Sequence, residues 1–128
     1  MDFTTHWNDT LALWSGEPNI KKGETAHVIR AAARKLVLAG LEGALDRIPA
    51  GRVLETIRKT QQRDGEMRGN FWWTWECGEV TDKNAAFFTT LWLLALRFEY
   101  YDALPAEART TLDTLIDEAG VYFTNHVF

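Results

Sequence analysis

Cysteine and serine are nearly absent from this chain of 128 residues, which holds one of each, Cys77 and Ser15. A single cysteine excludes an intrachain disulfide, so the fold has to rest on its core, and we expect Cys77 to be a small buried side chain. Ser15 lacks the Gly-x-Ser-x-Gly setting of a hydrolase nucleophile. The three histidines show no ligand spacing, so we predict neither a metal site nor a cofactor.

Basic charge and long apolar runs are scarce as well. The net charge is −4, and the lysines and arginines are scattered among acidic residues, which argues against nucleic acid or an anionic membrane surface as a partner. The longest apolar run, from Ala85 to Leu96, is interrupted by two threonines and is too short to span a bilayer. The first residues contain no apolar stretch typical of a secretory signal. These absences predict a soluble, cytoplasmic protein.

Apolar residues do recur at helical spacing, over four stretches of the chain. The predicted helices span residues 24 to 48, 51 to 62, 82 to 101 and 106 to 119, and a short helix is predicted ahead of them near the N-terminus. Gly40 and Gly43 fall inside the first helix, where we expect them to permit close packing of a neighbour. Residues 15 to 23 should form a polar linker. With 46% hydrophobic residues, the chain can bury the core of one all-α domain over residues 1 to 128.

Two of the helix connections have similar sequences. Asp46-Arg-Ile-Pro-Ala and Asp102-Ala-Leu-Pro-Ala share an Asp-x-[Ile/Leu]-Pro-Ala core, and their prolines, Pro49 and Pro105, stand 56 positions apart. A largely apolar helix precedes each turn and an amphipathic helix follows it, which is the pattern of an αα-hairpin. We therefore predict two tandem antiparallel helical hairpins with equivalent turns at the two prolines.

Three tryptophans, Trp72, Trp73 and Trp75, stand within four positions of the segment between the second and third helices. The run Asn70-Phe-Trp-Trp-Thr-Trp-Glu-Cys-Gly78 resembles the Asn-Trp-Trp-x-Trp-Glu-Ile-Gly motif of toroidal polysaccharide lyases of the hyaluronate and chondroitin lyase type. The preceding Asp64-Gly65 is similar to a feature of other six-hairpin carbohydrate-active enzymes. The resemblance covers about 15 residues and implies a partial α/α toroid, a ring of helical hairpins whose connecting loops hold the ligand.

The resemblance also implies roles for five residues of this chain. Trp72 and Trp73 would form the platform under a sugar chain, Trp75 and Glu76 would be framework or contact residues, and Asn84 would be a polar contact. An indole suits this task because its face packs on the apolar C–H face of a pyranose ring. Since the protein is acidic, we expect a neutral glycan unless Arg63, Arg68 and Lys83 cluster around the loop.

The sequence offers no catalytic set to accompany this platform. Lyase chemistry of this type uses an Asn, a His and a Tyr, for which the only candidates are Asn125, His126 and the Tyr100/Tyr101 pair. A closed toroid needs about five to seven hairpins, and this chain has room for about two. The chain is therefore expected to be either a segment of a longer protein or a small protein that completes its core with another copy. Whether it cleaves a glycan is left open.

Each feature also has a plainer interpretation. Trp75 is expected to point inward and anchor the loop, and adjacent Trp72 and Trp73 should diverge, because an extended backbone directs consecutive side chains to opposite sides. Glu76 and Asp64 could serve as an acid and base pair. The plainer interpretation is that Glu76 holds a backbone N–H or pairs with Arg68, and that Asp64 shapes a turn.

The competing functional class is a helical interaction or oligomerisation module without enzymatic activity. Its aromatic loop would dock a protein partner or a second copy, since Trp and Tyr are enriched in protein interfaces. The third predicted helix, residues 82 to 101, is apolar nearly all round, and two hairpins cannot cover it on every side. We therefore expect the isolated chain to self-associate.

Overall fold

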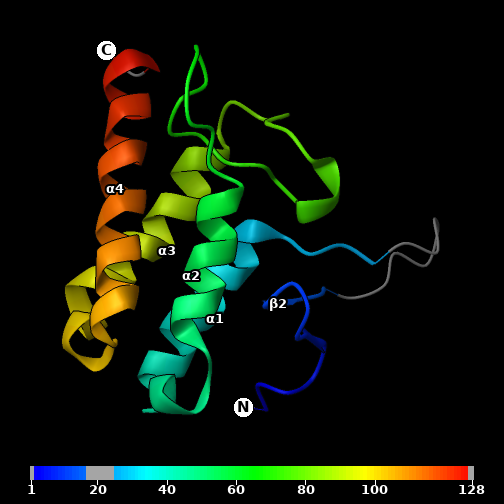
Figure 1. Ribbon diagram of the computed structural model, residues 1–128, viewed down its shortest axis with the longest axis vertical. Helices are drawn as coiled ribbons and strands as arrows, with labels where there is room; N and C mark the ends of the chain where they lie inside the picture. Colours follow the sequence, from blue (N-terminus) through cyan, green and yellow to red (C-terminus); the bar gives the residue numbers. More distant parts are fainter. Residues whose placement is uncertain (1, 17–24, 127–128) are drawn as a thin grey trace.

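The computed structural model describes residues 2 to 16 and 25 to 126 and is predominantly helical (Figure 1). Its elements are β1 (Trp7–Asn8), β2 (Leu13–Trp14), α1 (Ile29–Leu41), α2 (Ala50–Lys59), α3 (Ala85–Tyr100) and α4 (Ala106–His126). The two short strands pair in an antiparallel manner, and the remaining regular structure is helical, so the predicted all-α class is confirmed. In this described part of the chain, every helix is too short or too polar to cross a bilayer.

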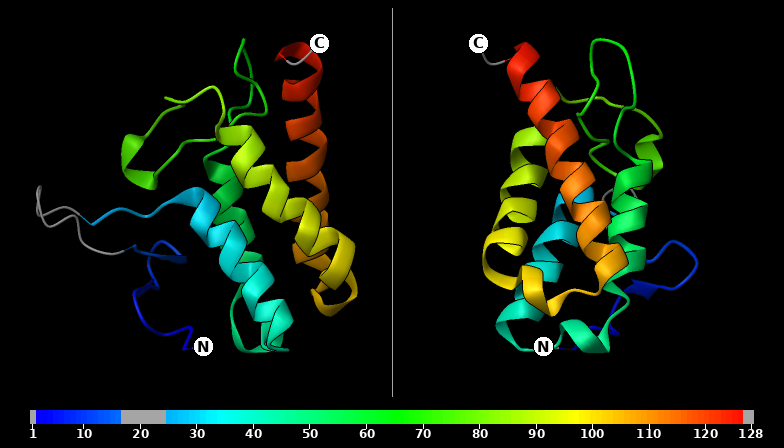
Figure 2. Two further views of the ribbon diagram at one scale, coloured as in Figure 1. Left: turned by 180° about the vertical axis from the view of Figure 1, so that it is seen from behind. Right: turned by 60° about the vertical axis from the view of Figure 1, so that its left-hand side comes forward.

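The four helices form two antiparallel hairpins that lie side by side (Figures 1 and 2). α1 pairs with α2 and α3 pairs with α4, while α3 also packs along α1 and α4 along α2. α1 and α3 run in the same direction, since Arg30 approaches Phe88 at one end and Gly40 approaches Tyr100 at the other. The result is a layer of α1 and α3 packed on a layer of α2 and α4.

The two hairpins repeat with a fixed offset. Equivalent elements begin 56 positions apart, at Ile29 and Ala85 for α1 and α3, at Leu45 and Tyr101 for a 3-10 turn, and at Ala50 and Ala106 for α2 and α4. The carbonyl of Pro49 accepts a hydrogen bond from the N–H of Val53, and that of Pro105 accepts one from Arg109, both at 3.1 Å. Pro49 and Pro105 therefore occupy equivalent turns.

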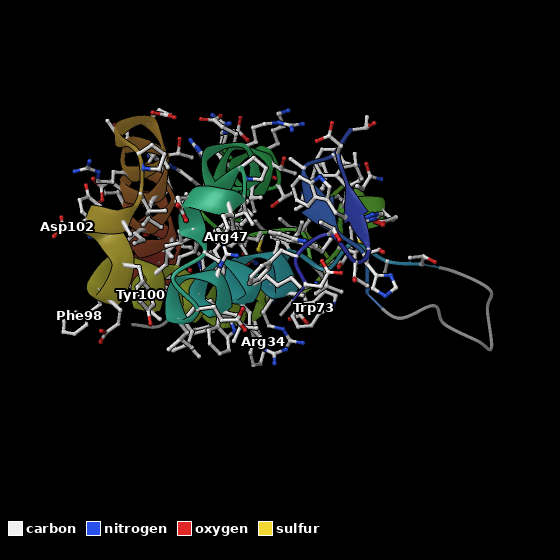
Figure 3. All side chains as sticks on the ribbon, turned by 90° about the horizontal axis from the view of Figure 1, so that it is seen from below. Arg34, Arg47, Trp73, Phe98, Tyr100 and Asp102 are labelled. Atoms are coloured by element: carbon white, nitrogen blue, oxygen red, sulfur yellow. The ribbon has the colours of Figure 1, made fainter. Side chains whose placement is uncertain are left out.

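The first helix is shorter than predicted. Its predicted start at Glu24, like most of the predicted linker 15 to 23, lies outside the described residues, and α1 itself begins at Ile29. It ends at Leu41 because Gly43 adopts a left-handed φ of 64°, so the prediction that Gly43 lies inside the helix is wrong. Gly40 does lie inside, and a Cβ there would stand 2.6 Å from the Tyr100 ring, as Figure 3 illustrates with Tyr100 between α3 and α1. Close packing at Gly40 is confirmed.

The short helix predicted near the N-terminus is absent from residues 2 to 16, where the chain forms the β1–β2 pair instead. The rings of Trp7 and Trp14 meet across these strands with centroids 4.8 Å apart, and the Trp14 indole N–H donates to the carbonyl of Phe3 at 2.8 Å. Aromatic side chains favour such cross-strand pairs. The prediction failed because His6 and Ala12 adopt left-handed φ values of 63° and 57°, which interrupt a helix, and because the structure of this segment depends on the packing of two tryptophans.

Candidate functional site

The segment that connects α2 to α3 is held in place by backbone hydrogen bonds on both sides. Near α2, the N–H of Trp72 donates to the carbonyl of Thr60 at 3.1 Å. Near α1, the N–H of Ile29 donates to the carbonyl of Trp73 at 3.1 Å, and the N–H of Trp75 donates to the carbonyl of His27 at 2.9 Å. Residues 70 to 78, called the tryptophan loop below, are thus attached to both helices of the first hairpin.

The side chain that anchors the tryptophan loop in the core is Phe71. Phe71 is completely buried, whereas Trp72, Trp73 and Trp75 are each only partly buried. The neighbouring Asn70 is also fully buried and supports the loop, because its amide nitrogen donates to the carbonyl of Asp82 at 3.1 Å and its amide oxygen accepts from the N–H of Phe71 at 2.8 Å. Phe71 is therefore the chief core anchor of the loop, and Trp75, for which an anchor was predicted, packs against the core with part of its surface exposed.

The two adjacent tryptophans diverge, as an extended backbone requires. Trp73 turns toward α3, where its ring meets Phe88 edge to face at 5.8 Å, and the Arg30 guanidinium lies 5.2 Å from its ring centre. Trp72 instead packs against Trp75, with ring centroids 5.5 Å apart and planes inclined by 53°. The partly exposed indole pair of this loop is consequently Trp72 with Trp75, and the predicted platform of Trp72 with Trp73 is divided between two surfaces.

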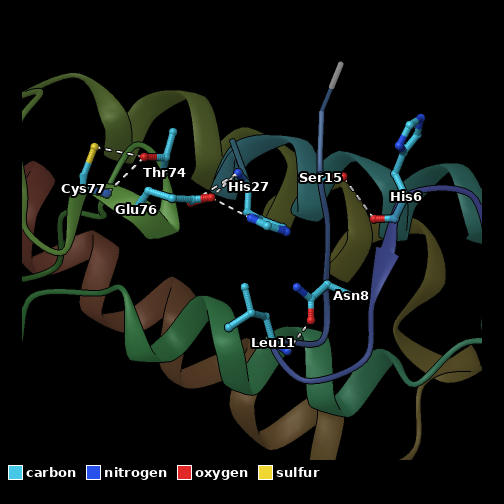
Figure 4. Close-up of polar contacts among 8 residues, drawn as sticks. All are labelled: His6, Asn8, Leu11, Ser15, His27, Thr74, Glu76 and Cys77. Carbon is cyan, nitrogen blue, oxygen red and sulfur yellow. Dashed lines mark hydrogen bonds and ion pairs between the residues drawn. The ribbon is translucent and has the colours of Figure 1, made fainter. Parts of the chain in front are cut away.

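Glu76 fastens the loop to the start of the first hairpin through His27 (Figure 4). One carboxylate oxygen of Glu76 accepts from the backbone N–H of His27 at 2.8 Å and lies 2.6 Å from Nδ1 of the same residue. The interpretation in which Glu76 holds a backbone N–H is confirmed. The predicted contact with Arg68 is wrong, because Arg68 pairs with Glu118 of α4 at 3.0 Å.

His27 is the site residue that the sequence did not single out. It precedes Glu76 by 49 positions and has no neighbouring ligand or motif, so no local pattern marks it. The side chain of Glu76 keeps 43% of its surface exposed, against 14% for His27. The Glu76 carboxylate is therefore open to solvent and is not enclosed among apolar side chains. The arrangement instead suits a clip that positions the tryptophan loop.

Two further predicted contacts lie at the edges of the loop. Asn84 is exposed directly before α3, and its backbone N–H donates to a carboxylate oxygen of Asp82 at 2.7 Å. Asp64 precedes Gly65, whose φ of 74° places it in the left-handed region, so the turn interpretation of Asp64 fits.

No three His, Cys, Asp or Glu side chains converge on a possible metal position within residues 2 to 16 and 25 to 126.

Cys77 lies in the 3-10 turn Trp75–Cys77 and is exposed, so the prediction of a buried side chain is wrong. The turn ends at Gly78, which adopts a left-handed φ of 65°. The Thr74 hydroxyl donates to the sulfur at 3.0 Å, and this hydrogen bond lowers the pKa of the Cys77 thiol below its ordinary value (Figure 4).

We expect Thr74→Val to raise the pKa of Cys77, because valine keeps the shape of threonine but donates no hydrogen bond to the thiolate. At neutral pH a smaller fraction of the thiol is then ionised, so alkylation by iodoacetamide should slow several-fold. The measurement is the alkylation rate of wild type and variant from pH 6 to 10, with free glutathione as reference. Identical pH profiles for the two proteins would contradict the assigned hydrogen bond.

A shallow groove lies on the outer side of α1 and α3, next to Trp73. Its lining residues are Arg30, Ala31, Arg34, Phe88, Leu91 and Trp92. This groove has an apolar floor supplied by α3 and two guanidinium groups supplied by α1. The tryptophan loop therefore has two distinct neighbourhoods, an indole pair at Trp72 and Trp75 and an apolar helical surface beyond Trp73.

Comparison with known proteins identifies no relative: no protein-family model, no curated protein and no solved structure matches the chain.

Proposed function

We propose that the protein binds a neutral glycan on the indole pair of Trp72 and Trp75. The observation that carries this proposal is that the two rings lie against each other, 5.5 Å between centroids, and both keep part of their surface exposed in a loop attached to both helices of the first hairpin. Indole faces bury the C–H faces of sugar rings at low cost in side-chain entropy. The inclination of 53° between the rings would let them contact two adjoining faces of a bent oligosaccharide.

The attachment of the loop supports the same proposal. A loop that is already ordered loses little conformational entropy when a ligand binds. The hydrogen bonds from His27 to Glu76 and from Trp75 to His27 fix the segment that carries the indole pair. Glu76 acts here as a positioning residue, and the proposed function is binding of the glycan without its cleavage.

The charges near the loop favour a neutral ligand. Arg68 is engaged with Glu118 of α4, and Arg30 lies over Trp73 rather than over the indole pair. Glu76 and Glu79, both exposed, follow directly on the pair in sequence. A sulfated or uronate polymer would meet this negative charge, while the Arg68 guanidinium is already paired with a carboxylate, so a neutral sugar is the better ligand.

The test is titration of the protein with a panel of neutral and acidic oligosaccharides, followed by saturation-transfer NMR and calorimetry. Because an aromatic contact contributes about 1 kcal/mol beyond its buried area, Trp72→Ala and Trp75→Ala should each weaken binding at least about fivefold. Phe98→Ala is the matched control, since it removes an exposed aromatic side chain from α3 and should leave glycan affinity unchanged. Absence of binding to every glycan, or equal losses in all three variants, would refute the proposal.

A second candidate function, protein docking, is favoured by a separate observation. The Trp73 ring contacts Phe88, which is one of the exposed apolar side chains of α3, and Trp73 does not belong to the Trp72–Trp75 pair. Interaction modules carry aromatic and aliphatic side chains of this kind at the centre of their interfaces.

A further inference from the structure

One solvent-facing strip of α3 is apolar from Phe87 to Phe98. Its exposed large side chains, called the α3 face below, are Phe87 (44%), Phe88 (45%), Leu91 (61%), Leu94 (47%) and Phe98 (87%). The opposite side of the helix is buried against α1 and α4. A helix that is hydrophobic all round is ordinarily covered on all sides.

The size of the α3 face indicates an interface. With roughly 200 Å² for a large side chain that is fully exposed, the five exposed fractions correspond to on the order of 500 Å² of accessible area. That value lies at the upper end of what a monomer presents as its largest apolar patch. Two such faces packed together would bury about 1,000 Å² in total, which is the lower bound for a specific interface.

The charges around the α3 face differ between its two ends. The helix carries no charged residue from Ala85 to Leu96. Beside its N-terminal half, Arg30 and Arg34 of α1 border the groove that contains Phe88, whereas the exposed Glu99 stands at the C-terminal end. The charge of the neighbouring Arg97 is offset by Asp113 of α4, 3.7 Å away. Figure 3 shows Arg34 and Phe98 pointing outward from α1 and α3. The surface is therefore basic near one end of an apolar strip and acidic at the other.

We propose that the α3 face binds the α3 face of a second copy of this chain, with the two α3 helices antiparallel about a two-fold axis near the middle of the helix. This pairing sets the end bordered by Arg34 in one protomer against Glu99 in the other, and the symmetry repeats the contact twice. A parallel pairing would instead bring like charges together, which disfavours the parallel orientation. The apolar strip supplies the buried area, and the charges select the orientation.

The dimer and the glycan site use different surfaces of the protein. The indole pair of Trp72 and Trp75 lies on the loop, and only Trp73 reaches the α3 face through Phe88. The inference therefore does not depend on glycan binding.

The first test is sedimentation equilibrium of the whole chain between about 1 and 200 μM. Wild type should be a dimer in this range, and Leu91→Asp should raise the dissociation constant at least about 100-fold, because it buries a carboxylate in the apolar strip. Leu91 is 61% exposed, so the variant should keep its helical circular dichroism. Thr110→Asp is the control, since it adds the same charge on the exposed surface of α4 and should remain dimeric. A monomeric wild type at 200 μM, or a Leu91→Asp dimer as tight as wild type, overturns the proposal.

The second test concerns the antiparallel orientation. Arg34→Glu and Glu99→Arg should each raise the dissociation constant about fivefold to tenfold, because each change places like charges opposite one another in both symmetric contacts. The double variant restores opposite signs and should recover most of the wild-type affinity. A double variant that is weaker than both single variants overturns the antiparallel pairing.

Discussion

Gly69→Ala is expected to lower the free energy of unfolding by about 3 to 4 kcal/mol, which would leave a domain of this size only marginally folded. Gly69 has a φ of 91°, where any side chain adds strain of about 1 to 2 kcal/mol. A Cβ there would also overlap the carbonyl oxygen of Glu118 in α4 and lie 2.9 Å from its carbonyl carbon. Because these are backbone atoms, the clash is relieved only if the loop and α4 separate, and overpacking of this kind costs about 1 to 3 kcal/mol.

Gly65→Ala is the control for Gly69→Ala. Gly65 has a similar left-handed φ of 74°, but a Cβ there would have no atom within 4 Å, so the strain acts alone and should cost about 1 kcal/mol. Urea denaturation followed by circular dichroism measures both free energies of unfolding. Equal losses in the two variants would show that Gly69 does not approach α4 closely.

The local parts of the fold were predictable because their signals are contained in short stretches. An apolar period of 3.6 marks each helix, and Pro49 and Pro105 mark the turns whether or not the hairpins have packed. Helix ends were less accurate, since α4 continues to His126, beyond the predicted end at residue 119, although the next residue, Gly120, is typical of a helix C-terminus. The segment stays helical there through contacts with α3, such as the ring contact of Phe123 with Phe87 at 5.0 Å.

The tryptophan loop was predictable in composition but not in geometry. The sequence identified Trp72, Trp73, Trp75 and Glu76 as a group. In the structure the three indoles are divided between two surfaces, and the Glu76 carboxylate is hydrogen-bonded to His27. That division depends on where α1 and α3 lie, which is decided by contacts between distant parts of the sequence, such as the pair of His27 and Glu76, 49 positions apart. A local motif carries no information about such contacts.

Phe71→Ala is expected to destabilise the protein by about 3 to 5 kcal/mol, because Phe71 is completely buried and its removal leaves a cavity under the loop. Trp72 is larger but only partly buried, and it belongs to the exposed indole pair, so Trp72→Ala should cost about 1 to 2 kcal/mol or less. The two variants thus separate the residue that anchors the loop from the residue proposed to contact the ligand. The resemblance to the lyase motif implied a ligand platform at Trp72 and Trp73 and gave Phe71 no role.

The measurement compares urea denaturation with hydrogen exchange of the backbone amides in the tryptophan loop. Phe71→Ala should lower the midpoint and also increase exchange at the N–H groups of Ile29 and Trp75, which are hydrogen-bonded across the loop and α1. Trp72→Ala should leave both amides protected while it weakens glycan binding, because its effect is limited to the exposed surface. If Trp72→Ala destabilised the protein as much as Phe71→Ala, Trp72 would be a core residue, and any loss of glycan binding in that variant would reflect unfolding of the loop.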